Sequence, residues 1–290
     1  MIGISYAIRL CKLAKIADEH IPFLVLFLYI SNGYVFVGFT GWVWFFAQTL
    51  CFTLSLMALY YAWKGQGGIA LSCWIFAVGC RPMILFYFPV LCVLLYGGSK
   101  KNKSIVSFFL KHVYWFVVPT IVGLAYLLLN ALRFGDPFEF GHNYLPEFMR
   151  SEHGQLSVHY LGKNLVDFLF GPPVRLGDAG PELQKFGFSR FLSSPIFICN
   201  LVWLAEDLVK RRMNWEKALL VALGALNVVL LCMHRTLGGF QFGMRYAMEL
   251  APFCLIYLLL SERREMRAWE AALLGFGLCF NFWGACVAHV

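Results

Sequence analysis

Residues 42–63, WVWFFAQTLCFTLSLMALYYAW, decide the fold class of this chain. The run contains no charged residue, and its length is close to the roughly 20 apolar residues with which an α-helix crosses a bilayer. Similar apolar runs recur along the chain, at 21–39, 108–132, 191–209, 217–233, 246–260 and 268–288. The sequence therefore predicts an all-α fold: a polytopic integral membrane helical bundle that forms a single membrane domain over residues 1–290.

The overall composition agrees with a membrane protein. Hydrophobic residues make up 60% of the 290 residues and charged residues only 14%, against roughly 45 to 50% and about 25% in soluble domains. The formal net charge is +8, but the bases fall in short clusters between apolar runs, as in cytoplasmic loops of membrane proteins. We therefore expect membrane lipids as neighbours and no binding of nucleic acid. The ten Cys are spread singly without a CxxC spacing, which predicts neither a disulfide framework nor a metal site.

The stretch 68–96 is ambiguous, because the tetrapeptide GCRP at 79–82 interrupts it. It is either one long span or a pair of short helices. Lys and Arg accumulate in cytoplasmic loops, and each crossing changes the side of the membrane. If residues 1–20 are a cytoplasmic N-terminal segment, the basic loop at 100–111 is also cytoplasmic only when 68–96 crosses an even number of times. We therefore predict a helical hairpin whose tip, Arg81-Pro82, lies near the outer face.

This topology contains about nine spans and an external loop at 133–190. The loop has acids, aromatic residues and Gly/Pro punctuation, which indicate a structured segment instead of a linker. Within it, Leu161, Leu165, Phe168 and Leu169 recur at helical spacing. They predict a surface helix, which either borders a lipid-accessible cavity or plugs the bundle.

Two arginines on the predicted outer side lie at membrane depth, where an unpaired charge is costly. The Arg81 guanidinium either binds a phosphate with two parallel hydrogen bonds or pairs with a carboxylate of another segment. Arg245 and Glu249 are four residues apart, so that on a helix they share one face. They either neutralise each other, or Arg245 stays available for a phosphate while Glu249 fixes its rotamer.

Motifs of soluble-nucleotide and metal chemistry are absent from the sequence. His142, His153 and His159 lie in the external loop without an HxH or HExxH pattern, so no metal site is predicted there. No GxSxG element, Walker loop or Rossmann fingerprint occurs either.

Four segments resemble a known family, the bacterial GT-C type membrane glycosyltransferases that use polyprenyl-phosphate-linked sugars and are akin to mannosyltransferases. Residues 130–144, NALRFGDPFEFGHNY, are similar to the family's passage from a span into an external loop. Residues 238–253, GGFQFGMRYAMELAPF, are similar to its loop into a late span. The tip at 79–82 resembles its Arg-Pro or Lys hairpin tip, and 159–173 resembles its surface helix.

The resemblance implies an enzyme of the plasma membrane that transfers a sugar from a lipid-linked donor to an acceptor at the external face. Transfer is by direct inversion, often with a divalent metal ion. A carboxylate base then deprotonates the acceptor hydroxyl. The residues expected to bind the donor are Arg81, His142, Arg245, Tyr246 and Glu249.

The family's base lies in the first external loop, after the first span. Here the corresponding turn, Phe39-Thr40-Gly41, contains no acid. The expectation is that the chain lacks the family's N-terminal spans and catalytic acidic loop. Two alternatives remain: Asp136 or Glu139 serves as the base, or the protein transfers nothing.

Other functional classes also fit a polytopic chain. A transporter or flippase of a lipid-linked glycan would show charged or broken helices near the bilayer midplane, often in related halves. The sequence shows no such repeat. A structural membrane subunit is the third hypothesis, and the sequence does not identify its protein partners.

Overall fold

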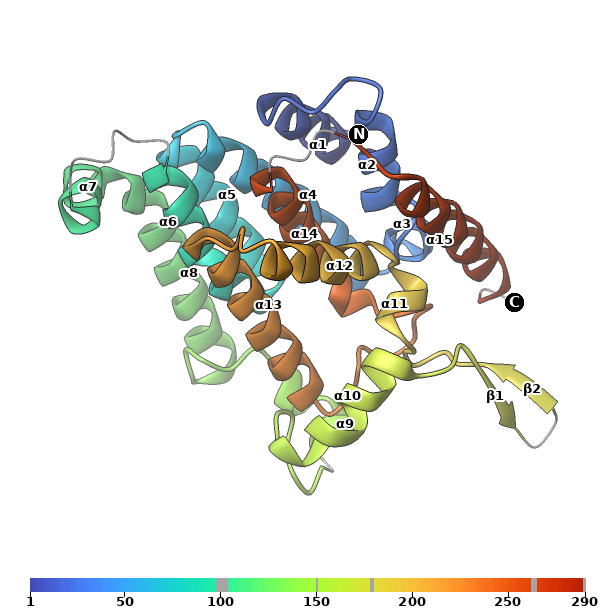
Figure 1. Cartoon of the computed structure of the whole chain (residues 1–290). Helices are drawn as coiled ribbons and strands as arrows, with labels where there is room; N and C mark the ends of the chain where they lie inside the picture. The colour runs from blue at the N-terminus through green and yellow to red at the C-terminus, as the bar shows by residue number, and fades with distance from the viewer. Residues whose placement is uncertain (98–103, 150, 178–179, 262–264, 289–290) are drawn as a thin grey trace.

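The structure is a computed structural model, and it describes residues 1–97, 104–149, 151–177, 180–261 and 265–288. Most of this chain is helical (Figure 1). Within these ranges four helices are long and apolar enough to cross a membrane: α4 (Val43–Trp63), α8 (Val117–Phe134) with the 3₁₀ turn η2 (Val113–Phe116) before it, α13 (Trp215–Met233) and α15 (Ala268–Val287). A fifth span is counted if one bent pair of helices is taken together. The predicted nine spans are therefore not confirmed.

The predicted span at 21–39 is a broken pair, α2 (Ile21–Tyr29) and α3 (Tyr34–Thr40), bent by 59°. Asn32 explains the break. Its amide nitrogen donates to the Leu28 carbonyl oxygen, and its Oδ1 accepts from the backbone N–H of Tyr34 at 2.7 Å. Such side-chain bonds compete with the helical backbone ladder, so the helix stops and restarts here.

The stretch 68–96 is divided at Arg81-Pro82, as predicted. It forms α5 (Gly67–Cys80), the 3₁₀ helix η1 (Pro82–Tyr87) and α6 (Phe88–Gly97). Trp74 on α5 donates from its indole to the Ile84 carbonyl oxygen at 3.0 Å, and its ring lies 5.0 Å from that of Phe88. The chain after the break therefore folds back along α5, which is the paired-helix interpretation of this stretch.

Other predicted spans begin later than the hydrophobic runs suggested. Separate short elements precede them: α7 (Ile105–Lys111) before η2, α11 (Arg190–Ser193) before α12 (Ile196–Val209), and the 3₁₀ helix η5 (Arg245–Leu250) before α14 (Ala251–Leu260). Pro195 and Pro252 lie at or near the starts of α12 and α14. Proline cannot donate to a preceding carbonyl but fits the first helical turn, which fixes these starts.

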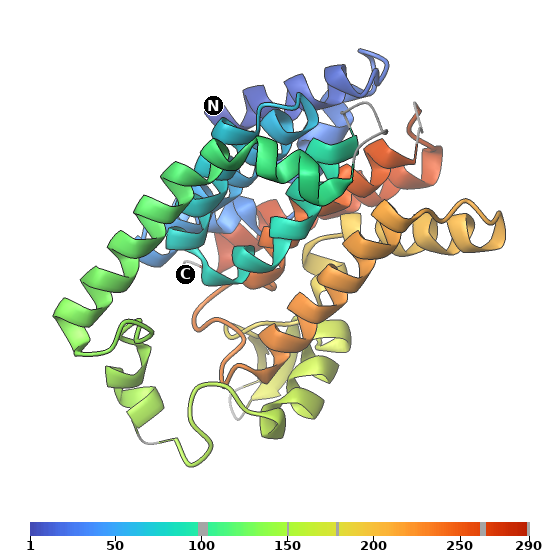
Figure 2. The same ribbon diagram turned by 90° about the vertical axis from the view of Figure 1, so that its left-hand side faces the viewer.

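The helix α14 lies in the core, and its residues 251–259 are all buried. It packs against α12, α13, α4 and α2. In contrast, α8 runs along the edge of the bundle (Figure 2), and within it only Pro119 is buried while Leu124, Leu128 and Leu132 are exposed. An apolar helix with so little protein contact is suited to lipid. The N-terminal α1 (Ile2–Leu13) packs on α4, where Tyr6 and Tyr61 share a hydroxyl hydrogen bond of 2.7 Å.

The predicted external loop is structured. It contains η3 (His142–Tyr144), α9 (Pro146–Met149), η4 (Val158–Tyr160), α10 (Leu161–Phe170), β1 (Val174–Gly177) and β2 (Gly180–Leu183). The helix α10 confirms the surface-helix prediction as a helix. The antiparallel hairpin β1–β2, with Val174 opposite Leu183, corrects the all-α expectation. All four β1 residues are exposed, so no alternation of buried and exposed positions marked this strand in the sequence.

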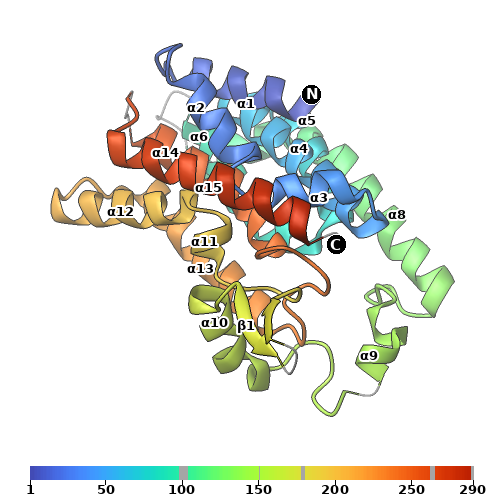
Figure 3. The ribbon, with the colours of Figure 1, turned by 90° about the vertical axis from the view of Figure 1, so that its right-hand side faces the viewer.

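The loop is attached by its backbone to the turn after α13. The Ser157 N–H donates to the Met233 carbonyl oxygen at 2.9 Å, and the Arg235 N–H donates to that of Gln155 at 2.8 Å. Further along, the Gln241 N–H donates to the carbonyl oxygen of Lys185 at 2.7 Å. The three views show the loop gathered at one end of the molecule, beside the end of α13 (Figures 1, 2 and 3).

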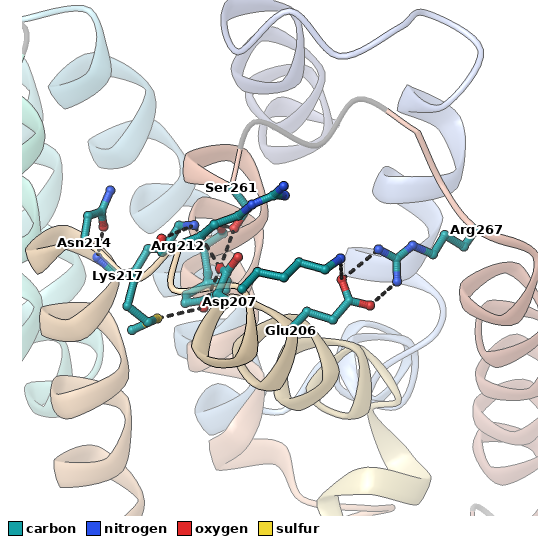
Figure 4. Close-up of polar contacts among 10 residues, drawn as sticks. Glu206, Asp207, Arg212, Asn214, Lys217, Ser261 and Arg267 are labelled. Atoms are coloured by element: carbon teal, nitrogen blue, oxygen red, sulfur yellow. Dashed lines mark hydrogen bonds and ion pairs between the residues drawn. The ribbon is translucent and has the colours of Figure 1, made fainter.

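A polar cluster lies at the opposite end of α13, where α12 and α14 end and α15 begins (Figure 4). Lys217 donates to Asp207 at 2.9 Å, and Asp207 also accepts from the Tyr257 hydroxyl at 2.9 Å. Glu206 pairs with Arg267. The 19 residues of α13 separate this cluster from the loop by roughly 28 Å, close to the hydrocarbon thickness of a bilayer. Of the predicted cytoplasmic loop, the bases at 100, 101 and 103 lie outside the described residues.

Candidate functional site

A pocket of about 250 Å³ lies where three distant segments meet. Arg81 comes from the junction of α5 and η1, and Glu139 and His142 come from the loop after α8. His234 comes from the turn after α13, and Tyr246 from the start of η5. The sequence predicted that Arg81, the loop 133–190 and Arg245 lie on one side, and the pocket brings together Arg81, the loop and Tyr246, the neighbour of Arg245.

Arg81 lines this pocket, and its extended backbone conformation ends α5. Its Nε donates to Oε1 of Glu249, and its guanidinium lies 4.3 Å from the centre of the Tyr246 ring. Of the two interpretations of Arg81, the ion pair with another segment is therefore realised. The guanidinium nevertheless lines the pocket, since Nε faces Glu249 and a guanidinium carries further N–H donors.

Of the two interpretations of Arg245 and Glu249, direct neutralisation of one by the other is not realised. Residues 245–250 form a 3₁₀ helix, in which three residues make a turn, so positions four apart do not share a face. The buried Glu249 pairs with Arg81 instead. Arg245 donates from Nε to the Gly238 carbonyl oxygen at 2.7 Å, and its guanidinium lies 5.1 Å from the centre of the Phe45 ring. Both residues form a layer beneath the pocket and do not line it.

Gln48 completes this buried layer and was missed by the sequence analysis. Its Nε2 lies 2.9 Å from the Arg245 carbonyl oxygen and 3.3 Å from Oε1 of Glu249. The sequence could have indicated this residue, because Gln48 is the one side-chain amide in the apolar run 42–63. Within the described chain Gln48 Oε1, Arg245 Nη1 and Glu249 Oε2 are buried without hydrogen-bond partners. The layer therefore keeps unused donor and acceptor capacity beside the pocket.

The two candidate bases occupy different places. Glu139 lines the pocket, and its oxygens accept from the Gly141 N–H and from the Asn143 side chain, each at 2.6 Å. The hydrogen bond from Asn143 lowers the pKa of Glu139, so its carboxylate is ionised at neutral pH. Asp136 is exposed and accepts from the Phe138 N–H at 2.8 Å, which closes a turn. Only Glu139 is placed to meet a ligand in this pocket.

His142 and His234 add imidazoles to the pocket lining. The His142 ring lies 6.0 Å from that of Trp44 on α4. Nδ1 of His234 lies 2.7 Å from the Thr236 carbonyl oxygen, and Nε2 lies 3.1 Å from the Gln155 amide nitrogen. Burial lowers the pKa of His234, which keeps the ring neutral at pH 7. Neither His234 nor Gln155 was identified from the sequence.

The remaining loop histidines lie elsewhere. The His153 and His159 rings are 4.0 Å apart but do not line the pocket. Throughout the described ranges, no group of three or more His, Cys, Asp or Glu side chains is arranged to hold a metal ion. The divalent metal implied by the resemblance therefore has no fitting donor set among these residues, and no chemical step is assigned to it.

Comparison with known proteins adds no family. No protein-family model matches the chain, and no curated protein or solved structure matches it significantly.

Proposed function

We propose that this chain is an integral membrane glycosyltransferase that takes a sugar from a polyprenyl-phosphate-linked donor and transfers it to an acceptor hydroxyl. The observation that supports this is the composition of the Arg81 pocket. It combines a guanidinium, a carboxylate, amide side chains and aromatic rings around one cavity. A phosphate is bound by guanidinium groups, and a sugar by amides, carboxylates and aromatic faces.

The donor phosphate is assigned to Arg81. Glu249 neutralises one side of this guanidinium and fixes its direction, and Tyr246 covers its face at 4.3 Å. Asn143 and Gln155 offer amides to sugar hydroxyl groups, and Phe138 offers a ring beside them. Arg245 supports Tyr246 from below, with 4.9 Å between its guanidinium and the Tyr246 ring centre.

Glu139 is assigned as the base. The acceptor oxygen forms a bond to the anomeric carbon while the bond from that carbon to the donor phosphate breaks. The phosphate leaves with the bonding electron pair as polyprenyl phosphate, and the acceptor proton passes to the Glu139 carboxylate. A positioned base of this kind contributes on the order of 10² to 10⁴ in rate.

The proposed orientation places residues 1–20 in the cytosol and the loop 133–190 outside, in the plasma membrane of a bacterium. Two features support it. Basic residues gather at the end of α13 that is distant from the loop, as in cytoplasmic segments. The pocket lies at the other end of α13, lined there by Leu231 and His234.

Glu139→Gln tests the assignment of the base. With the full chain in lipid nanodiscs and a labelled polyprenyl-phosphate sugar, transfer is expected to fall on the order of 10² or more, while donor binding persists. Asp136→Asn is the matched control, since Asp136 lies outside the pocket, and it is expected to keep full activity. Equal losses in both variants, or no transfer by the unmodified chain, would contradict the enzyme assignment.

A second candidate is a transporter or flippase of a lipid-linked glycan. The observation that favours it is the bent pair α2 and α3, because broken helices often form the substrate sites of transporters. Donor movement across vesicles without sugar transfer, abolished by Arg81→Met, would favour this candidate over the enzyme.

A further inference from the structure

A second pocket, of about 360 Å³, lies between α12 and α13. These helices diverge from their connection at 210–214 (Figures 1 and 2), and α10 closes the far side through Leu165 and Leu169. Its walls are largely apolar side chains, such as Leu201, Leu204 and Val228. Within the described ranges it shares no lining residue with the Arg81 pocket.

Arg190 brings a positive charge to this apolar pocket. Its guanidinium lies 3.9 Å from the centre of the Phe197 ring and 5.1 Å from that of Phe168. Its Nε is buried and has no hydrogen-bond partner in the described part of the chain. No carboxylate among the described residues pairs with it, unlike Arg81, which has Glu249, and Lys217, which has Asp207.

Tyr87 adds a second unused polar group. Its hydroxyl is buried without a hydrogen-bond partner, and its side chain lines the same pocket. The ring is held in place by stacking on Phe253, with 3.5 Å between the ring centres. Two buried donors from distant segments therefore meet one cavity, and buried polar groups in proteins are nearly always paired.

The aromatic rings around Arg190 do not remove this requirement. A cation–π contact stabilises the face of a guanidinium. The N–H donors lie in the plane of the group and still require an acceptor. A buried charge is also costly unless an opposite charge accompanies it. An anion supplies both the hydrogen-bond acceptor and the opposite charge.

We propose that this pocket binds an anionic membrane lipid, with its acidic headgroup at Arg190 and Tyr87 and a hydrocarbon chain along α12 and α13. Arg190 neutralises the headgroup and Tyr87 donates a hydrogen bond to it. The apolar wall between Leu201 and Val228 then replaces the lipid environment of the chain. This inference does not depend on sugar transfer, because the pocket is separate from that of Arg81.

Native mass spectrometry of the full chain in neutral detergent tests the proposal. Dioleoyl phosphatidic acid is expected to bind at least roughly tenfold more tightly than dioleoyl phosphatidylcholine, which corresponds to about one charge-assisted contact. Binding of oleate, which carries a carboxylate in place of a phosphate, shows which acidic headgroup the site prefers. Inorganic phosphate that binds as tightly as the lipid would overturn the amphiphile assignment.

Three variants and a control locate the site. Arg190→Met is expected to abolish the preference for the acidic lipid, and Tyr87→Phe to weaken it, whereas Arg175→Met in the exposed β1 strand leaves it unchanged. Gly224→Leu fills the tail region, because a Cβ at Gly224 meets open space. It is expected to exclude the lipid with Arg190 still in place, so the test does not depend on folding of the Arg190 variant.

Two results would overturn the proposal: equal binding of both phospholipids by the unmodified chain, or acidic-lipid binding that persists in Arg190→Met and Gly224→Leu alike. Failure of sugar transfer with intact lipid selectivity would remove the proposed function and leave this site standing.

Discussion

At the scale of single residues, buried charges are distinguished by their partners. The side chain of Glu249 is 1% exposed and that of Arg81 16%, and the two neutralise each other across 168 positions of sequence. Arg190 packs against aromatic rings, its Nε is buried, and no carboxylate among the described residues pairs with it. The same residue type therefore serves as a paired anchor at one site and as an unmet charge at another.

Removal of one partner of the Arg81–Glu249 pair is expected to destabilise the fold. Glu249→Gln leaves the Arg81 charge without its counter-ion and is expected to cost about 3 kcal/mol in the free energy of unfolding. Denaturant unfolding in micelles measures this, and the double variant Arg81→Met with Glu249→Gln is expected to recover part of the loss. Asp167→Asn, which breaks the exposed pair with Arg175, is the control with an expected effect below about 1 kcal/mol.

At the scale of elements, helices are held together by polar contacts at their ends. The cluster in Figure 4 joins the end of α12 to the starts of α13 and α15. At the other end of α13, backbone hydrogen bonds fix the turn 234–246 onto the loop. Because both ends of α13 are fixed, the length of this helix sets the distance between the polar cluster and the Arg81 pocket.

Among the bases of the polar cluster in Figure 4, Lys217 is expected to be the one whose substitution destabilises the fold most. Lys217→Met leaves Asp207 buried without its cation and is expected to lower the free energy of unfolding by about 3 kcal/mol. Lys210→Met is the matched control, since the Lys210 side chain is half-exposed and 3.9 Å from Glu206, and little change is expected. Similar thermal shifts for both variants would show that the Asp207 pair does not hold α12 to α13.

Acidification is expected to loosen the turn 234–246. Burial lowers the folded-state pKa of His234 below its ordinary 6.5, so between the two values the unfolded chain binds more protons. Stability is therefore complete above about pH 6.5 and falls as the pH decreases toward the folded-state pKa. His234→Asn is expected to flatten the pH dependence of the melting temperature in this window. An unchanged slope would assign the pH dependence to other groups.

At the scale of the whole molecule, the proposed membrane orientation rests on two features, an exposed apolar surface and polar ends. The helix α8, of which only Pro119 is buried, lies at the edge of the bundle (Figure 2). The loop and the polar cluster occupy opposite ends of α13. The proposed pocket is on the outer side only if the loop is exported.

Cysteine labelling tests this orientation. In a background with the exposed Cys279 and Cys286 changed to Ser, Val158→Cys is expected to react with an impermeant maleimide in intact cells. Lys12→Cys is expected to react only in inverted vesicles. The reverse pattern would place the pocket in the cytosol and remove the proposed transfer at the external face.

The sequence by itself determined the helical class and the long apolar helices near 42–63, 217–233 and 268–288, and it predicted one side for Arg81, His142 and Tyr246, which line one pocket. The helices follow from uninterrupted hydrophobic runs, which are a local property of the sequence. Only the tertiary structure decided where apolar runs break, as at Asn32, and which acid neutralises which base. A polar group chooses its partner by proximity in space, and the acid that Arg81 needed lay 168 positions away.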